Sequence, residues 1–208
     1  MNNLILKEIS FNRRNIILSV VAPVVGTILL GFEQGDYSIM IFYMSWVLCF
    51  TFFIGKSCYM DERGSTLNYL KTLPTKTSNI VNIKFLLTLI TIIQGWALVY
   101  IGGYLLTIIG KSAHNINYKL IVPVLAIHLL YCGLYLFLFF RFNFSSTQYS
   151  FVIVFAVLLF TKMIGSKNYL NVNSINLSML PYIIIIVTLI LFVVLWRLSV
   201  SAFARRVN

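Results

Sequence analysis

The chain has 208 residues, of which 60% are apolar and 10% are charged, and its mean hydropathy is +0.91. This small number of polar side chains cannot cover the surface of a water-soluble globule. The composition therefore excludes a soluble domain and indicates an integral membrane protein. The formal net charge of +11 raises the alternative of a nucleic-acid-binding protein, which depends on where the basic residues lie.

Residues 2–13 precede the first apolar run and show a weak helical pattern. Ile5 and Ile9 share one side of a helix and Lys7 lies on another, which predicts a short amphipathic helix at the membrane surface. A disordered tail is the alternative. The apolar run that follows has no small-residue cleavage site after it, which favours a retained first span over a secretory signal.

Six apolar runs follow one another along the chain. Each is close to the roughly 20 helical residues that cross the hydrocarbon core, and none alternates as barrel strands do. The predicted spans are at about 15–32, 37–57, 85–110, 120–140, 148–164 and 180–197. We therefore predict an all-α integral membrane protein with six transmembrane helices. No repeat or linker divides residues 1–208, so we expect a single membrane domain.

The second and third predicted spans carry aromatic and small residues in distinct patterns. The aromatic side chains of the second span, Trp46 among them, pack in the bundle or, alternatively, line an apolar path. In the third span glycines recur on one stripe, which predicts the close approach of another helix. Gln94 lies beside that stripe and needs a hydrogen-bond partner, so we expect it to contact a neighbouring helix. The stripe consists of Gly95, Gly102, Gly103 and Gly110.

The segment 61–84 is a polar interruption between the second and third spans. Ser65 can cap a short helix that Pro74 ends, so we predict a helix at about 65–73. On a helical wheel one arc of this helix is largely apolar and the opposite arc is polar. The first arc holds Thr66, Leu67, Leu70 and Leu73, and the second holds Asn68 and Thr72.

The apolar outer segment 162–179 contains too many large side chains for an ordinary solvated loop. Such a segment lies in the membrane interface or re-enters the bundle, and re-entry requires that protein cover its backbone. We state re-entry as a hypothesis.

The basic residues are distributed unequally among the loops. With both termini cytoplasmic, twelve Lys and Arg, including all seven Arg, lie inside, and four Lys lie outside. This asymmetry is the positive-inside signature of membrane topology. The inner basic residues also lie where anionic headgroups attract them. We therefore predict cytoplasmic termini and contact with the lipid bilayer, and no nucleic-acid partner.

Motifs for catalysis and for ion coupling are missing. The sequence has no phosphate-binding loop, no His pair at metal spacing and no Gly-x-Ser-x-Gly turn. No predicted span contains Asp or Glu, since Glu8 is expected in the tail and Asp61 and Glu62 in a loop. We expect no catalytic residue, metal site or cofactor on this chain, and we expect His128 to be a bonded structural residue.

The sequence from Asp61 to Pro74, followed by Ile80-Val81 and Lys84, resembles the loop after the second span in ATP-binding-cassette (ABC) permeases of the type 2 export class. The resemblance implies a second permease, either a copy or a paralogue, and two copies of a separate ATPase subunit that would hold ATP and Mg. The helix at 65–73 would be the coupling helix that docks into the ATPase. Its contact residues would be Glu62, Arg63, Gly64, Thr66, Leu67, Leu70, Leu73 and Pro74.

The resemblance also implies a translocation path at the permease dimer interface, formed by spans two and five. Its residues would be Phe42, Trp46, Cys49, Phe50, Phe53, Phe151, Phe155 and Leu159. So apolar a surface suits lipid-like, drug-like or amphipathic peptide cargo. The small six-span form most resembles bacterial exporters of antimicrobial or cytolytic peptides, such as phenol-soluble-modulin exporters, which implies the bacterial cell membrane. Two alternatives are a substrate-capture subunit of an energy-coupled importer and a stand-alone immunity or scaffold protein.

Overall fold

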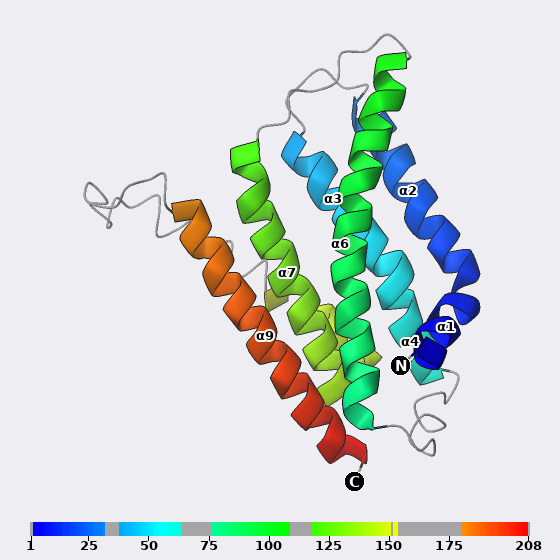
Figure 1. Ribbon diagram of the computed structural model, residues 1–208, viewed down its shortest axis with the longest axis vertical. Helices are drawn as coiled ribbons and strands as arrows, with labels where there is room; N and C mark the ends of the chain where they lie inside the picture. Colours follow the sequence, from blue (N-terminus) through cyan, green and yellow to red (C-terminus); the bar gives the residue numbers. More distant parts are fainter. Residues whose placement is uncertain are drawn as a thin grey trace.

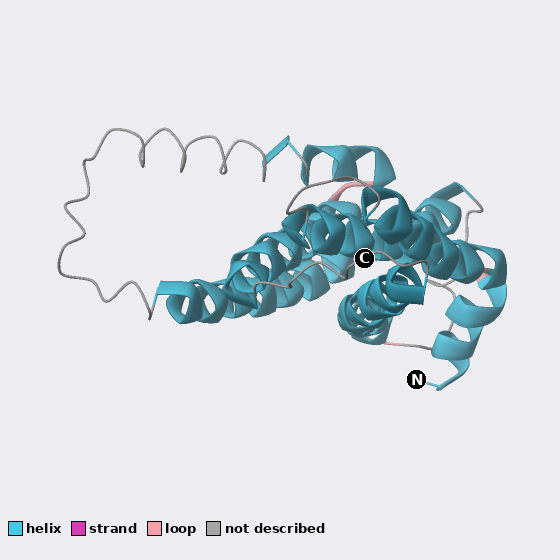
Figure 2. Cartoon of the chain, turned by 90° about the horizontal axis from the view of Figure 1, so that it is seen from above, coloured by secondary structure: helices cyan, strands magenta, loops and turns pink. Residues whose placement is uncertain are grey.

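The computed structural model describes residues 2–31, 38–63, 76–108, 118–150, 152–153 and 180–207. Within these ranges the chain forms helices and short connections and no strand (Figure 2). The elements are α1 (Asn2–Phe11), α2 (Arg13–Gly31), α3 (Ser38–Phe50), the π-helix η1 (Thr51–Gly55), α4 (Lys56–Arg63), α6 (Thr77–Ile108), α7 (Tyr118–Arg141), the 3-10 helix η2 (Phe144–Thr147) and α9 (Leu180–Val207).

The long helices lie side by side, and both chain ends lie at the same end of the bundle (Figure 1). Helices α1 and α4 are at that end too, which we call the lower end after its place in Figure 1. This arrangement agrees with a topology in which both termini face one side of a membrane. The predicted amphipathic helix at the N-terminus is present as α1.

Three of the described helices are long and apolar enough to cross a membrane. They are Thr77–Ile108, Val122–Arg141 and Tyr182–Arg206. The all-helical class and several candidate spans are therefore confirmed. Helices α2 and α3 lie at the first two predicted spans, whereas most of the predicted span 148–164 lies outside the described residues. Six spans and their sidedness stay a prediction.

The end of the second predicted span differs from the expectation. We placed Asp61 and Glu62 in a loop, but the helix continues through η1 and α4 to Arg63, so that placement was wrong. The reason is tertiary: Ser57, Cys58 and Asp61 are buried, so α4 is held by a packed face that its low hydropathy does not reveal. The predicted helix at 65–73 lies outside the described residues.

Two of the four predicted glycines of α6 let neighbouring helices approach closely, whereas Gly103 meets no other side chain and Gly110 lies outside the described residues. A Cβ atom added at Gly95 would lie 2.5 Å from Cδ1 of Trp46 on α3, and one at Gly102 would lie 2.7 Å from Cγ2 of Thr27 on α2. Next to Gly95, the amide Nε2 of Gln94 donates to the hydroxyl (3.0 Å) and to the carbonyl oxygen (3.2 Å) of Ser19. The predicted interhelical contact of Gln94 is therefore confirmed.

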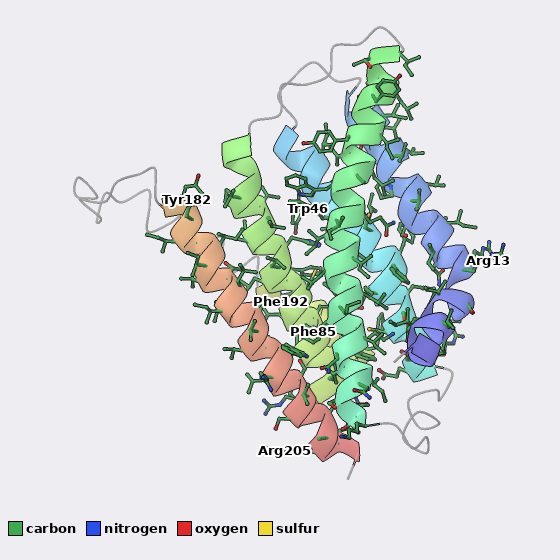
Figure 3. All side chains as sticks on the ribbon, in the orientation of Figure 1. Arg13, Trp46, Phe85, Tyr182, Phe192 and Arg205 are labelled. Atoms are coloured by element: carbon green, nitrogen blue, oxygen red, sulfur yellow. The ribbon has the colours of Figure 1, made fainter. Side chains whose placement is uncertain are left out.

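Trp46 joins three helices in the interior. Its side chain is fully buried, its Nε1 donates to the carbonyl oxygen of Ile92 (3.1 Å), and its ring stacks on His128 of α7 at 5.7 Å (Figure 3). The Nε2 atom of His128 lies 3.3 Å from Sγ of Cys132. These contacts agree in part with the prediction of a bonded structural histidine, because the Nδ1 atom of His128 is buried without a hydrogen-bond partner. On the other side of α6, the ring of Phe85 meets that of Phe192 on α9 edge-on at 5.3 Å.

We predict that Gly95→Ala lowers the stability of the bundle, because the new methyl group would collide with the ring of Trp46. Overpacking of this kind costs about 1–3 kcal/mol, which outweighs the roughly 1 kcal/mol by which Ala favours a helix. Gly103→Ala is the matched control, since nothing lies within 4 Å of the added atom. Thermal unfolding in detergent measures both variants, and equal midpoints would contradict the packing.

Candidate functional site

The lower end of the bundle holds a group of charged and polar side chains where α1, α4 and α6 meet, and all of them except the partly exposed Lys7 are buried. The group, which we call the ionic cluster, consists of Lys7, Glu8, Ser57, Asp61 and Lys84. Lys7 and Glu8 come from α1, Ser57 and Asp61 from α4, and Lys84 from α6. Residues that are far apart in the sequence are therefore joined at one point.

Lys84 lies at the centre of the ionic cluster. Its Nζ atom is 2.8 Å from Oδ2 of Asp61 and 3.0 Å from Oε2 of Glu8. The second ammonium, that of Lys7, bridges the same two carboxylates at 2.9 Å from Asp61 and 3.3 Å from Glu8. The hydroxyl of Ser57 accepts from Lys84 and donates to Glu8. The side-chain amide of Asn12 donates to the carbonyl oxygen of Glu8 (3.0 Å), which adds a hydrogen bond at the end of α1.

Because most of these charged groups are buried, they have to be paired with one another. Lys84 is 1% exposed, Asp61 3% and Glu8 5%. An unpaired charge at such depth would cost several kcal/mol, so each ionised group needs an opposite charge and hydrogen bonds. Two ammonium groups and two carboxylates give the ionic cluster a net charge of zero, so its members depend on one another.

The environment of Glu8 favours its charged form. Burial by itself raises the pKa of this carboxyl, but the charges of Lys84 and Lys7 and the hydrogen bonds from Ser57 and Lys84 outweigh it and lower the pKa to about 2. Glu8 is therefore ionised throughout the physiological pH range. Its role is that of a fixed ion-pair partner rather than a proton carrier.

The ionic cluster lies on both sides of the predicted coupling segment. Helix α4 ends at Arg63, just after Asp61, and α6 begins at Thr77, about two helical turns before Lys84. The Lys84–Asp61 pair therefore ties together the two helices between which residues 64–75 run. Through Glu8, the same contact attaches α1 to both helices.

The two predicted coupling residues that the structure describes have different surroundings. Glu62 is half-buried and accepts a hydrogen bond from the backbone N–H of Phe144, the first residue of η2. Arg63 is exposed, and its guanidinium donates to the hydroxyl of Tyr59. Arg63 is thus accessible to a partner, whereas Glu62 holds α4 to η2. The other predicted coupling residues lie outside the described part: Gly64, Thr66, Leu67, Leu70, Leu73 and Pro74.

Four residues of the predicted translocation path are described with their side chains, and all four are buried within this chain. Trp46 and Cys49 are 0% exposed, Phe50 1% and Phe53 5%. In this conformation they pack among the helices, so a path along them requires α3 to separate from its neighbours. The side chain of Phe42 and the residues Phe151, Phe155 and Leu159 lie outside the described part, and the path stays a prediction.

Sequence reasoning missed the ionic cluster. It placed Glu8 in the tail and Asp61 in a loop, and it took Lys84 as a cytoplasmic charge and as part of the family resemblance, without a buried partner for any of them. A signal was present, because Lys84 is flanked by the apolar residues Ile83 and Phe85, and a lone charge in such a run needs a buried partner. The described residues contain no group of three metal-ligating side chains.

We predict that Glu8→Gln destabilises the protein by about 3–5 kcal/mol, because it leaves the buried ammonium of Lys84 and the partly exposed one of Lys7 with one carboxylate. The double variant Glu8→Gln/Lys84→Met restores neutrality, and its loss should be smaller than the sum of the single losses by about 1–3 kcal/mol. Glu62→Gln, which keeps an oxygen acceptor for Phe144, is the control outside the ionic cluster. Unfolding midpoints in detergent give the cycle, and additive losses would refute the coupling.

The lowered pKa of Glu8 predicts a pH dependence of stability. A carboxyl whose pKa falls from 4.5 to about 2 on folding contributes stability above pH 4.5, and this contribution is lost as the pH falls towards 2. The difference in unfolding midpoint between the wild type and Glu8→Gln should therefore be constant from pH 7 to 5 and shrink between pH 4.5 and 2. A difference that does not change with pH would argue against an ionised Glu8.

Residues 3–204 match the protein family described as ABC-2 family transporter protein. The match covers nearly the whole chain and includes all five residues of the ionic cluster and the segment between α4 and α6. No curated protein and no solved structure matches the chain.

Proposed function

We propose that this chain, which belongs to the ABC-2 family of transporter proteins, is part of an exporter. As a member of that family it is a membrane permease subunit that pairs with ABC ATPase subunits and does not itself carry the ATPase. In this proposal the segment 64–75 contains the coupling helix and docks into a separate ATPase. Closure of two ATPase subunits around ATP and Mg then moves the segment, and the bundle converts this movement into outward transport.

The observation that carries the proposal is the ionic cluster. A coupling helix transmits force only if the helices at its two ends follow it. The Lys84–Asp61 contact joins these two helices at 2.8 Å, and Glu8 adds α1 at 3.0 Å. Pulling one helix away from the others would leave buried charges unpaired, at a cost of several kcal/mol. Movement of α1, α4 and the lower end of α6 as one body is therefore energetically favoured.

Helix α6 has the form of a lever for this movement. Its 32 residues extend over about 48 Å, more than the roughly 30 Å of the hydrocarbon core. Its lower end carries Lys84, and its upper half carries the close contacts of Gly95 and Gly102 with α3 and α2. A displacement at the lower end thus reaches both neighbouring helices.

The cargo in this proposal is a hydrophobic or amphipathic molecule, and specifically a peptide. This part rests on the apolar character of the predicted path and on the resemblance to small bacterial peptide exporters. It places the protein in a bacterial cell membrane, beside a second permease, either a copy or a paralogue. The importer and scaffold alternatives gain no support from the family match.

We predict that Leu70→Asp abolishes association with the ATPase while membrane insertion stays intact, because a charge would fall on the apolar arc of the predicted coupling helix. Asn68→Asp adds the same charge on the opposite arc and should leave association within about twofold, because an exposed charge there contributes only a few tenths of a kcal/mol. Co-purification with the partner ABC ATPase measures both. Full ATPase binding by Leu70→Asp would count decisively against the proposal.

A further inference from the structure

Three arginine side chains surround a pocket of about 430 Å³ between α7 and α9. Arg141 is the last residue of α7, and Arg205 and Arg206 lie in the last turn of α9. Phe137 and Leu198 form part of the apolar wall, and none of the lining residues is acidic. The pocket therefore combines concentrated positive charge with an apolar surface, at the lower end of the bundle where the C-terminus lies (Figure 1).

Two of the three guanidinium groups are held in place by the protein. The Nη1 atom of Arg206 donates to the carbonyl oxygen of Phe139 on α7 at 3.1 Å. The guanidinium of Arg141 lies over the rings of Phe142 (5.3 Å) and Phe137 (5.7 Å). A guanidinium carries five N–H donors, so these contacts leave donors for a ligand. Planar donors in a fixed position suit the oxygen atoms of a phosphate group.

An exposed apolar stripe on α9 leads into this pocket. Leu191, Val194 and Leu198 are 43–47% exposed and follow one another at helical spacing on one face. The same spacing continues to Arg205 at the lower end of α9, the end opposite Tyr182 (Figure 3). From Leu191 to Leu198 the stripe covers about 10 Å, which fits within the roughly 15 Å of hydrocarbon in one leaflet.

We propose that the pocket binds the phosphate group of an anionic phospholipid from the leaflet at the lower end of the bundle, with an acyl chain along the stripe of α9. The arginine side chains supply the charge that recognises the headgroup, and the stripe favours a lipid over a soluble phosphate. Basic pockets between helix ends at the cytoplasmic surface are a recurrent form of such recognition. The bound lipid would join the ends of α7 and α9.

The test compares lipid retention by two variants that lose the same charge. Arg141→Gln/Arg205→Gln/Arg206→Gln removes the pocket charges, and Arg13→Gln/Arg14→Gln/Arg197→Gln removes three arginines that do not line the pocket. Both are purified from nanodiscs of equal parts phosphatidylglycerol and phosphatidylcholine, and native mass spectrometry counts the bound lipids. We expect the first variant to lose at least about tenfold in phosphatidylglycerol retention, since the loss of one charge-assisted hydrogen bond to the phosphate in the pocket already accounts for a factor of about ten. The control should change by less than about twofold.

Further measurements separate the possible ligands. Inorganic phosphate and glycerol phosphate at millimolar concentration should not displace the lipid from the wild type, and displacement would identify a soluble phosphate and overturn the lipid assignment. Equal loss in both triple variants would show general attraction to anionic membranes and overturn it as well. Loss of ATPase association with unchanged lipid retention would assign the pocket to the ATPase. If the pocket variant does not fold, Arg205→Gln decides, because this exposed side chain should still lower retention.

Discussion

The contact between Lys84 and two carboxylates is the constraint on which the lower end of the bundle depends. The three buried charges are tolerable only if they are neutralised at short distance, by one another and by the partly exposed Lys7, so this contact fixes the relative positions of α1, α4 and α6. Apolar packing alone would let these helices slide, because it is not directional. The ionic cluster therefore defines the register of the helices that flank the segment 64–75.

In the upper half of the bundle, close packing rather than ion pairing fixes the positions of the helices. Gly95 admits the ring of Trp46, Gly102 admits Thr27, and the Gln94–Ser19 hydrogen bonds fix the depth at which α2 meets α6. Helix α6 is thus attached to its neighbours by ion pairs at the lower end and by close backbone approach above. Helix α6 forms one group with α1, α2, α3 and α4, whereas α7 packs chiefly on α9.

The sequence predicted those features that are written in local patterns. Long apolar runs located the helices, and the stripe of small residues located the face of α6 that α2 and α3 approach. It failed for α4 and the ionic cluster, because their burial comes from contacts between segments up to 76 residues apart, such as Lys84 with Glu8. Hydropathy marks such residues as exposed, and only the assembled helices show which charges meet. The one local sign of the ionic cluster was the single charge of Lys84 within an apolar run.

In the proposed mechanism, the predicted path residues that are buried in this conformation would become accessible when the two groups of helices separate. Trp46 and Phe50 lie at the boundary between the groups, where their rings contact His128 of α7. In that mechanism a force on the segment 64–75 would move α1, α4 and the lower end of α6 together, because separating them would expose unpaired charges. The described contacts across the boundary are apolar and aromatic packing and hydrogen bonds such as that from Trp196 to Asn82, with no ion pair among them. The π-helix η1 lies between α3 and α4, where a turn of irregular hydrogen bonding can absorb the difference in their movements. We therefore propose the boundary at Trp46 and Phe50 as the place where this bundle opens during transport.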